Sequence, residues 1–147
     1  MDYDQLLTDP GEAGIFARPA DHAALDAAAT RVGLARWSVD LAGVRSQAEF
    51  LAALAGRLEF PEWFGQNWDA LSDVLTELAW EQPNGVLLTL ERCGDLARAD
   101  AAAFETALEV LDGVAESCYD EGIPFWVFID GVDAAAFDLP VLGEGLG

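Results

Sequence analysis

The order of apolar and polar positions divides the chain into short strands that alternate with helices. Apolar residues are continuous over 86–90 and 125–129, as in strands buried on both faces. Over 37–41 they alternate with polar residues, the pattern of a strand with one buried face, and 14–17 could form a short strand. This alternation of strands and helices favours an α/β fold with a mainly parallel sheet and right-handed crossovers.

A spacing of three to four residues between apolar positions predicts helices over 19–32, 46–58 and 67–78, and a long helix from about Asp100 to Gly122. The second helix begins with the Ser-x-x-Glu form of a capping box, and an asparagine is a good N-cap for the third. Glycine at the end of the long helix suits the left-handed residue that often follows a helix.

The two ends of the chain have weaker patterns. Residues 1–13 have the composition of a loose acidic tail, and 133–147 that of a peripheral C-terminal tail. We therefore expect an N-terminal extension over 1–34, which could add a strand and a helix, and one main domain over 35–132.

Charge is the most unusual feature of the composition. The chain has 27 acidic and seven basic residues and a net charge of −20, and every basic residue is an arginine. Such a chain repels nucleic acid and anionic membranes and attracts a basic protein partner. Charge alone does not distinguish a surface that binds a basic partner from acidic residues that only keep the protein soluble. No leader-like or membrane-spanning apolar run is present, so we expect a cytoplasmic location.

The sequence offers little for catalysis. His22 is the only histidine, Cys93 and Cys118 have no CxxC spacing, and no nucleophile elbow or phosphate-binding glycine motif is found. We expect a protein that is not an enzyme and has no cofactor and no metal. A carboxylate site for Mg²⁺ stays open as an alternative, although no spacing supports it.

An acidic face is predicted on the third helix. On a helical wheel Asp69, Asp73 and Thr76 share an arc of about 60°, and the two carboxylates lie about 6 Å apart along the axis. The opposite side of the helix is apolar and should face the core: Leu71, Val74, Leu75 and Leu78. A pair of aspartates four residues apart is usually only a solvated helix face.

The aromatic loop before this helix favours a binding function. Trp68 lies towards the apolar side, and either Trp63 or Phe64 should point inward; we expect Trp63 to point outward. A large ring beside carboxylates has the composition of an interface hot spot. A nuclease cleft, lined with Arg and Lys that hold phosphates, is one basic surface that such a face would fit.

The pattern Pro-Glu-aromatic-aromatic-Gly-x-Asn-x-Asp-Ala-Leu-x-Asp-x-Leu-Thr over 61–76 resembles the barstar family, the intracellular inhibitors of barnase-type ribonucleases. The order of predicted elements over 36–130 is also similar. The resemblance implies a small parallel sheet of three strands packed with helices, to which the extension could add a fourth. It also implies inhibition by insertion of the second helix of the family domain, and the loop before it, into the enzyme's active site.

The resemblance also implies roles for single residues. Asp73 would take a phosphate position, Asp69 would pair with an arginine or another active-site cation, and Thr76 would lie at the rim. Trp63 stands where the family usually has tyrosine and would stack on a catalytic side chain. Glu77 adds charge at the rim.

Three further positions follow from the same resemblance. Gly65 and Asn67 would shape the loop. A family acid late in the long helix matches Glu116 if one residue is inserted after it, and otherwise the position is Ser117.

The function expected from the sequence is inhibition of a basic extracellular-type ribonuclease or nuclease toxin, in a one-to-one complex without nucleic acid or membrane. The alternative is a non-inhibitory binding or regulatory module for another basic protein. A metal-dependent enzyme is the third hypothesis.

Overall fold

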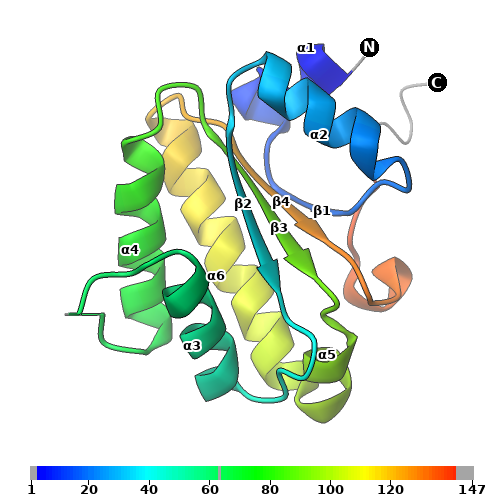
Figure 1. Cartoon of the computed structure of the whole chain (residues 1–147), viewed down its shortest axis with the longest axis vertical. Helices are drawn as coiled ribbons and strands as arrows, with labels where there is room; N and C mark the ends of the chain where they lie inside the picture. The colour runs from blue at the N-terminus through cyan, green and yellow to red at the C-terminus, as the bar shows by residue number, and fades with distance from the viewer. Residues whose placement is uncertain (1–2, 63, 142–147) are drawn as a thin grey trace.

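The fold is built on four parallel strands in the order β1-β4-β3-β2, as seen in a computed structural model that describes residues 3–62 and 64–141 (Figure 1). The strands are β1 (Ile15–Ala17), β2 (Ala35–Asp40), β3 (Val86–Glu91) and β4 (Phe125–Ile129). The predicted α/β class is confirmed, and the N-terminal extension supplies the fourth strand, which pairs in parallel with β4.

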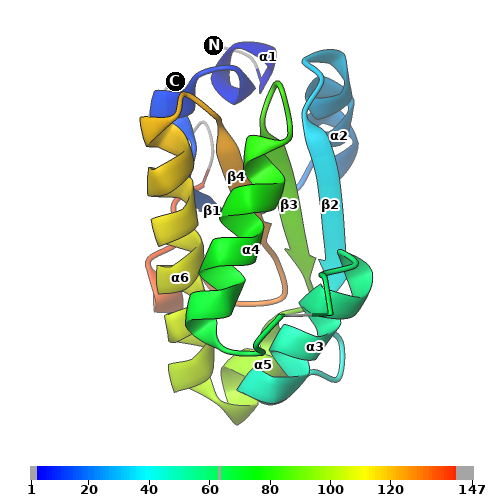
Figure 2. The same ribbon diagram turned by 90° about the vertical axis from the view of Figure 1, so that its left-hand side faces the viewer.

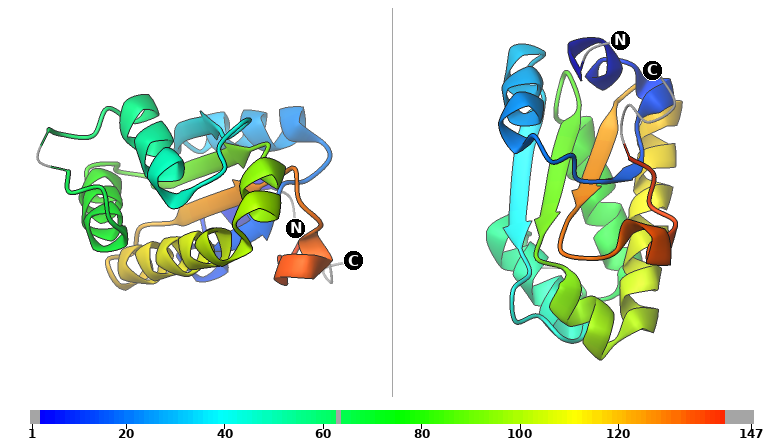
Figure 3. Two further views of the ribbon diagram at one scale, coloured as in Figure 1. Left: turned by 90° about the horizontal axis from the view of Figure 1, so that it is seen from below. Right: turned by 90° about the vertical axis from the view of Figure 1, so that its right-hand side faces the viewer.

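Helices cover both faces of the sheet (Figures 1 and 3). On one face lie α3 (Gln47–Arg57), α4 (Trp68–Trp80) and α6 (Ala101–Asp120), with the short α5 (Gly94–Ala99) before α6. On the other lie α1 (Tyr3–Leu7) and α2 (His22–Arg31). Two 3-10 turns, η1 (Pro10–Glu12) and η2 (Ala134–Phe137), complete the described elements. None of the described helices is both long and apolar enough to cross a membrane.

The helix boundaries follow from their capping residues. The Ser46 hydroxyl accepts from the Glu49 N–H at 3.2 Å at the start of α3, as the capping box predicts. Asp100 caps α6 through the Ala103 N–H at 3.1 Å. At the other end of α6, Gly122 adopts a φ of +74° and closes a Schellman motif, in which the Ile123 N–H donates to the Cys118 carbonyl at 2.8 Å.

The central strands β3 and β4 are buried on both faces, and two apolar cores result. Leu87, Trp126 and Phe128 face the core under α1 and α2. Their neighbours along β3 and β4 face the core under α3, α4 and α6 and include Leu88 and Val127. The continuous apolar runs of β3 and β4 therefore predicted their burial correctly, since both sides of each strand are covered.

Residues 3–13 do not form a loose tail, so this expectation was wrong for the described part of the segment. α1 places Leu6 and Leu7 in the second core, where both are almost fully buried. The Trp126 indole N–H donates to the Leu7 carbonyl at 3.2 Å. The segment is too short for its apolar periodicity to show in the sequence. It is ordered because it covers Trp126, which would otherwise be exposed to water on that face of the sheet.

The described C-terminal residues, up to Val141, pack against α6 and the outer edge of β1. Phe137 packs edge-on against Phe104 with ring centroids 4.8 Å apart. The Ala17 N–H donates to the Pro140 carbonyl at 2.8 Å, and Val141 forms a bridge with Ala17. The outer edge of β1 is thus partly covered by this segment.

We expect Leu7→Ala to lower the free energy of unfolding by about 2–5 kcal/mol, because it removes a fully buried side chain and leaves a cavity. Chemical denaturation followed by tryptophan fluorescence measures this. Glu12→Ala, at an exposed position of the same extension, is the matched control and should change it by less than about 0.5 kcal/mol. Equal effects would show that the extension is not part of the folded core.

Candidate protein-binding face on α4

The outer side of α4 presents carboxylates to solvent. Asp69, Asp73 and Glu77 are exposed, and Thr76 is half-buried with its hydroxyl donating to the Ser72 carbonyl at 2.7 Å. The opposite side of the helix is buried: Leu71, Val74, Leu75 and Ala79. Figure 2 shows α4 running along the outside of the molecule with no other element over its outer face. The structure thus brings the predicted acidic residues of α4 onto one open surface.

These carboxylates repel one another and have no neutralising partner. Asp69, Asp73 and Glu77 follow at intervals of four residues, and each like-charged pair at this spacing costs a helix about 0.2–0.5 kcal/mol. Of the six ion pairs found among the described residues, none involves them. The unfavourable charge is therefore free to be neutralised by a basic partner.

The neighbouring α6 extends this negative surface. α4 and α6 both run opposite to the strands and pack side by side, because each returns the chain to the start of the next parallel strand (Figure 2). Neither helix contains a basic residue. The outer side of α6 carries exposed acids along its length: Glu105, Glu109, Asp112, Glu116 and Asp120.

The loop before α4 is held by its own packing and by a helix cap. Asn67 accepts from the Ala70 N–H at 2.8 Å and donates from its amide to the Gly65 carbonyl at 3.4 Å. Phe64 is only 8% exposed and packs on Phe60, with ring centroids 5.0 Å apart. Gly65 and Asn67 are themselves exposed, and their loop-shaping role stays a prediction.

The described rings at the start of α4 pack against other aromatic side chains of the first core. Trp68 is half-buried and packs on Phe50 at 5.8 Å between centroids. With Phe64 buried as well, one of the two neighbouring loop rings points inward, as predicted. Trp63, expected to point outward, lies outside the described residues, so its direction stays a prediction.

Glu116 and Ser117, the two candidates for the late position on α6, lie on different sides of the helix. One flank of α6 faces β1 and η2, where Leu108 and Asp112 line a cavity. On a wheel of 100° per residue, Glu116 lies within about 40° of Asp112, whereas Ser117 lies about 140° from it, on the flank towards α4. α6 continues without interruption to Asp120. Glu116 thus adds to the negative outer surface but does not adjoin the α4 face.

The chemistry of the described residues does not suggest a catalytic centre. Burial, with a smaller contribution from the nearby Asp130 charge, raises the pKa of Cys93 to about 12. Burial raises the pKa of Cys118 to about 11. Both thiols are therefore protonated and weakly nucleophilic near neutral pH. His22 is exposed at the start of α2, and no cluster suited to a metal ion occurs in 3–62 or 64–141.

Comparison with known protein families identifies a matching family. The family model described as Barstar (barnase inhibitor) matches residues 35–130, well over half of the chain. The chain belongs to the barstar family. Its members are inhibitors of barnase-type ribonucleases, and the match confirms the resemblance found in the sequence. No curated protein matches the chain.

The family domain coincides with part of the fold. The barstar match begins at β2 and ends directly after β4, so it contains α3, α4, α5 and α6 and three of the four strands. β1, α1 and α2 lie before the match, and η2 lies after it. The candidate face on α4 is therefore inside the family domain, whereas the second core depends on residues outside it.

Trp80 is a surface residue that the sequence analysis missed. It is 52% exposed, one of few large apolar side chains so exposed in the described chain. It lies about 20° from the outward direction of Asp69 on the wheel, three turns further along α4. The prediction ended this helix at residue 78, two positions too early. A helical wheel continued to residue 80 would have placed the indole at the end of the row formed by Asp69, Asp73 and Glu77, the acidic stripe of α4.

We expect Asn67→Ala to lower the free energy of unfolding by about 1 kcal/mol, because the first turn of α4 loses the side-chain acceptor for an N–H group. Asn67→Ser keeps such an acceptor and is the matched control. Urea denaturation of both variants measures the difference. If serine destabilises as much as alanine, the cap is not what Asn67 contributes.

Proposed function

We propose that this chain inhibits a basic ribonuclease or nuclease toxin by covering its active site with the outer face of α4 and the loop before it. The observation that carries the proposal is the row of Asp69, Asp73 and Glu77, exposed and without ion-pair partners in the described structure. The membership in the barstar family supplies the class of partner.

The proposed inhibition is electrostatic and steric. A ribonuclease holds its substrate with cationic side chains, and carboxylates on a rigid helix would occupy those positions in place of phosphates. Asp73 is central on the stripe and takes the position nearest the catalytic cations, while Asp69 pairs with a second cation. Thr76 and Glu77 contact the rim, and Trp63 stacks on an active-site side chain. Ser117, on the adjacent flank of α6, is preferred to Glu116 as the late-helix contact.

The charge of the whole molecule supports fast recognition. A net charge of −20 and two helices without a basic residue create a long-range field that steers a basic enzyme to this side. We propose a one-to-one complex formed in the cytoplasm of the producing cell, which the inhibitor would protect. No catalytic activity, cofactor or metal is part of this function.

Trp80 extends the proposed interface beyond the acidic residues. The indole lies about 10 Å along the helix axis from Asp73, within the radius of an ordinary interface. A half-exposed tryptophan beside carboxylates suits an arginine of the partner, which can stack on the ring while it pairs with an acid. The indole would thereby add a contact on which the choice among basic nucleases depends.

We expect Asp73→Ala to weaken binding to the cognate ribonuclease by at least about 2 kcal/mol, because a cation of the enzyme then stays buried without a partner. A panel of small secreted basic ribonucleases, measured by inhibition and surface plasmon resonance, identifies the cognate enzyme and tests this. Glu105→Ala is the matched control, since it removes the same charge from an exposed site on α6. It should slow association slightly and leave dissociation unchanged.

Two results of this panel would count against the proposal. Inhibition by the Asp73 variant at wild-type affinity would show that α4 is not the inhibitory face. Tight binding of a basic protein without loss of its nuclease activity would favour the alternative, a non-inhibitory binding module.

We expect Trp80→Ala to weaken the same complex by about 1–2 kcal/mol, mainly through faster dissociation, because the partner loses an apolar contact. Tyr119→Ala is the matched control: Tyr119 is 57% exposed, but it lies on α6 near Gly11 of the extension, away from α4. The two dissociation rates give the comparison. Equal rates for the two variants would remove Trp80 from the interface.

A further inference from the structure

The two edges of the sheet differ in how they are protected. Beyond β1, the chain itself covers part of the edge, since the Pro140 carbonyl accepts from the Ala17 N–H and Val141 bridges to Ala17. At the other edge, β2 has β3 as its one neighbour in the described sheet. An uncovered edge strand presents unpaired N–H and C=O groups that can bind another strand.

The register of β2 shows which backbone groups are free. The Ala35 N–H donates to the Gly85 carbonyl at 2.9 Å, and the Leu41 N–H donates to the Glu91 carbonyl at 2.8 Å. Backbone groups alternate in direction along a strand, so odd-numbered residues of β2 bond to β3. The N–H and C=O groups of Arg36 and Ser38 therefore point away from the sheet, towards solvent.

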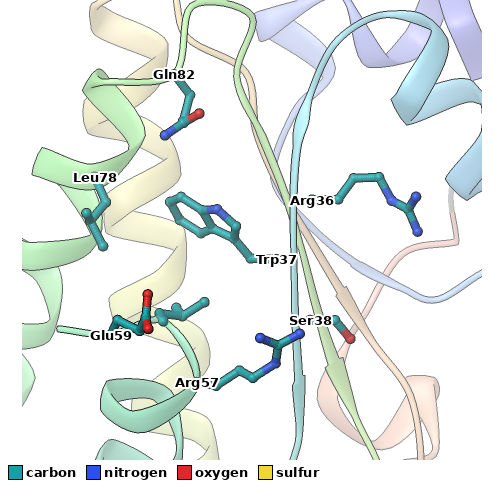
Figure 4. Close-up of a pocket in the computed structure, with 8 residues that line it drawn as sticks. Arg36, Trp37, Ser38, Arg57, Glu59, Leu78 and Gln82 are labelled. Atoms are coloured by element: carbon teal, nitrogen blue, oxygen red, sulfur yellow. The ribbon is translucent and has the colours of Figure 1, made fainter.

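A cavity lies on each side of this edge. One, of about 270 Å³, is between β2 and α4 and is shown in Figure 4. The other, of about 280 Å³, opens on the face of the sheet that α2 partly covers. The two cavities share four lining residues: Arg36, Trp37, Ser38 and Arg57. They are thus the two flanks of one groove along β2.

The two flanks differ in chemistry. In Figure 4 the Trp37 side chain points towards Leu78 of α4, and Leu58 completes the apolar part of that flank. Arg18, Arg36 and Arg57 line the other flank together with Thr89. Three of the chain's seven basic residues therefore line a single cavity in a protein with a charge of −20.

The arginines of the second flank are not equally neutralised. Arg18 is paired with Asp130 at 2.9 Å, and Arg36 is paired with Asp26 at 3.3 Å. Arg57 is exposed and has neither an ion pair nor a hydrogen bond to any described residue. Its positive charge, beside the partly exposed Arg36, is what a carboxylate of a ligand would meet.

We propose that the open edge of β2 binds an extended segment of another protein in which apolar and acidic side chains alternate. The segment would add a strand to the sheet through the free backbone groups of Arg36 and Ser38, a known mode of peptide recognition. Successive side chains of a strand point to opposite faces. An apolar side chain would therefore enter the flank with Trp37, and the next, acidic one would meet Arg57.

A second copy of this chain is a poorer occupant of the groove. Antiparallel pairing of two β2 strands about Ser38 would set Arg36 opposite Asp40, but the Asp40 carboxylate is already paired with Arg92. It would also bring together two chains of −20 each. The inference does not depend on the proposed ribonuclease inhibition, because the groove lies on the sheet-facing side of α4, away from its acidic stripe.

The test uses two synthetic seven-residue peptides, one of alternating valine and glutamate and one of alternating valine and lysine, with blocked ends. The charge of the whole protein favours the lysine peptide, so tighter binding of the glutamate peptide would identify the local arginines as its cause. We expect amide shifts of ¹⁵N-labelled full-length protein at Arg36 and Ser38 on addition of the glutamate peptide. Tighter binding of the lysine peptide, or shifts confined to other surfaces, would overturn the proposal.

Two pairs of variants test the contacts. Arg57→Glu should weaken glutamate-peptide binding at least tenfold, whereas Arg45→Glu, the same change at an exposed arginine outside the groove, should alter it less than threefold. Ser38→Pro removes an outward N–H that makes no bond within the sheet, and it should weaken binding tenfold relative to Ser38→Ala, which keeps that N–H. Equal effects within the arginine pair would contradict the proposal even if the proline variant fails to fold. Concentration-dependent dimerisation through β2 without peptide would assign the edge to a second copy instead.

Discussion

The central strands β3 and β4 have no face that can be left in water, and the rest of the molecule is arranged to cover them. Trp126 and Phe128 face one side of the sheet while Phe125 and Val127 face the other. Apolar burial of this kind is the main stabilising term in folding. It requires helices on both faces, and in this chain those of the second face come from the N-terminal extension, outside the matched barstar domain.

Covering a parallel sheet also determines where the charge lies. Because β2, β3 and β4 are parallel, α4 and α6 must return in the same direction and pack next to each other. Their apolar sides face the sheet, and their acidic sides face solvent without a basic residue between them. The repulsion lowers helix stability, and a basic partner would relieve it. A surface that is unfavourable in the free protein is in this way suited to binding.

Edges of the sheet follow from the same topology. The extension places β1 beside β4, where the C-terminal segment partly covers it, and leaves β2 as an open edge with a cavity on each flank. α4 borders both surfaces of interest. Its outer side carries the acidic stripe, and its inner side, through Leu78, lines the groove at β2. Two different partners could therefore contact one helix without sharing a residue on it.

The sequence by itself determined the α/β class, the caps at Ser46 and Asn67, and the side of α4 that carries Asp69 and Asp73, because strand period, helix period and capping are local properties. It did not reveal α1, whose Leu6 and Leu7 are ordered only by contact with Trp126, or the end of α4 at Trp80. The side of α6 that faces α4, and the presence of Arg36 and Arg57 in one groove at the edge of β2, were decided by the tertiary structure alone. Both depend on which elements become neighbours, and long-range packing sets that rather than any pattern within one segment.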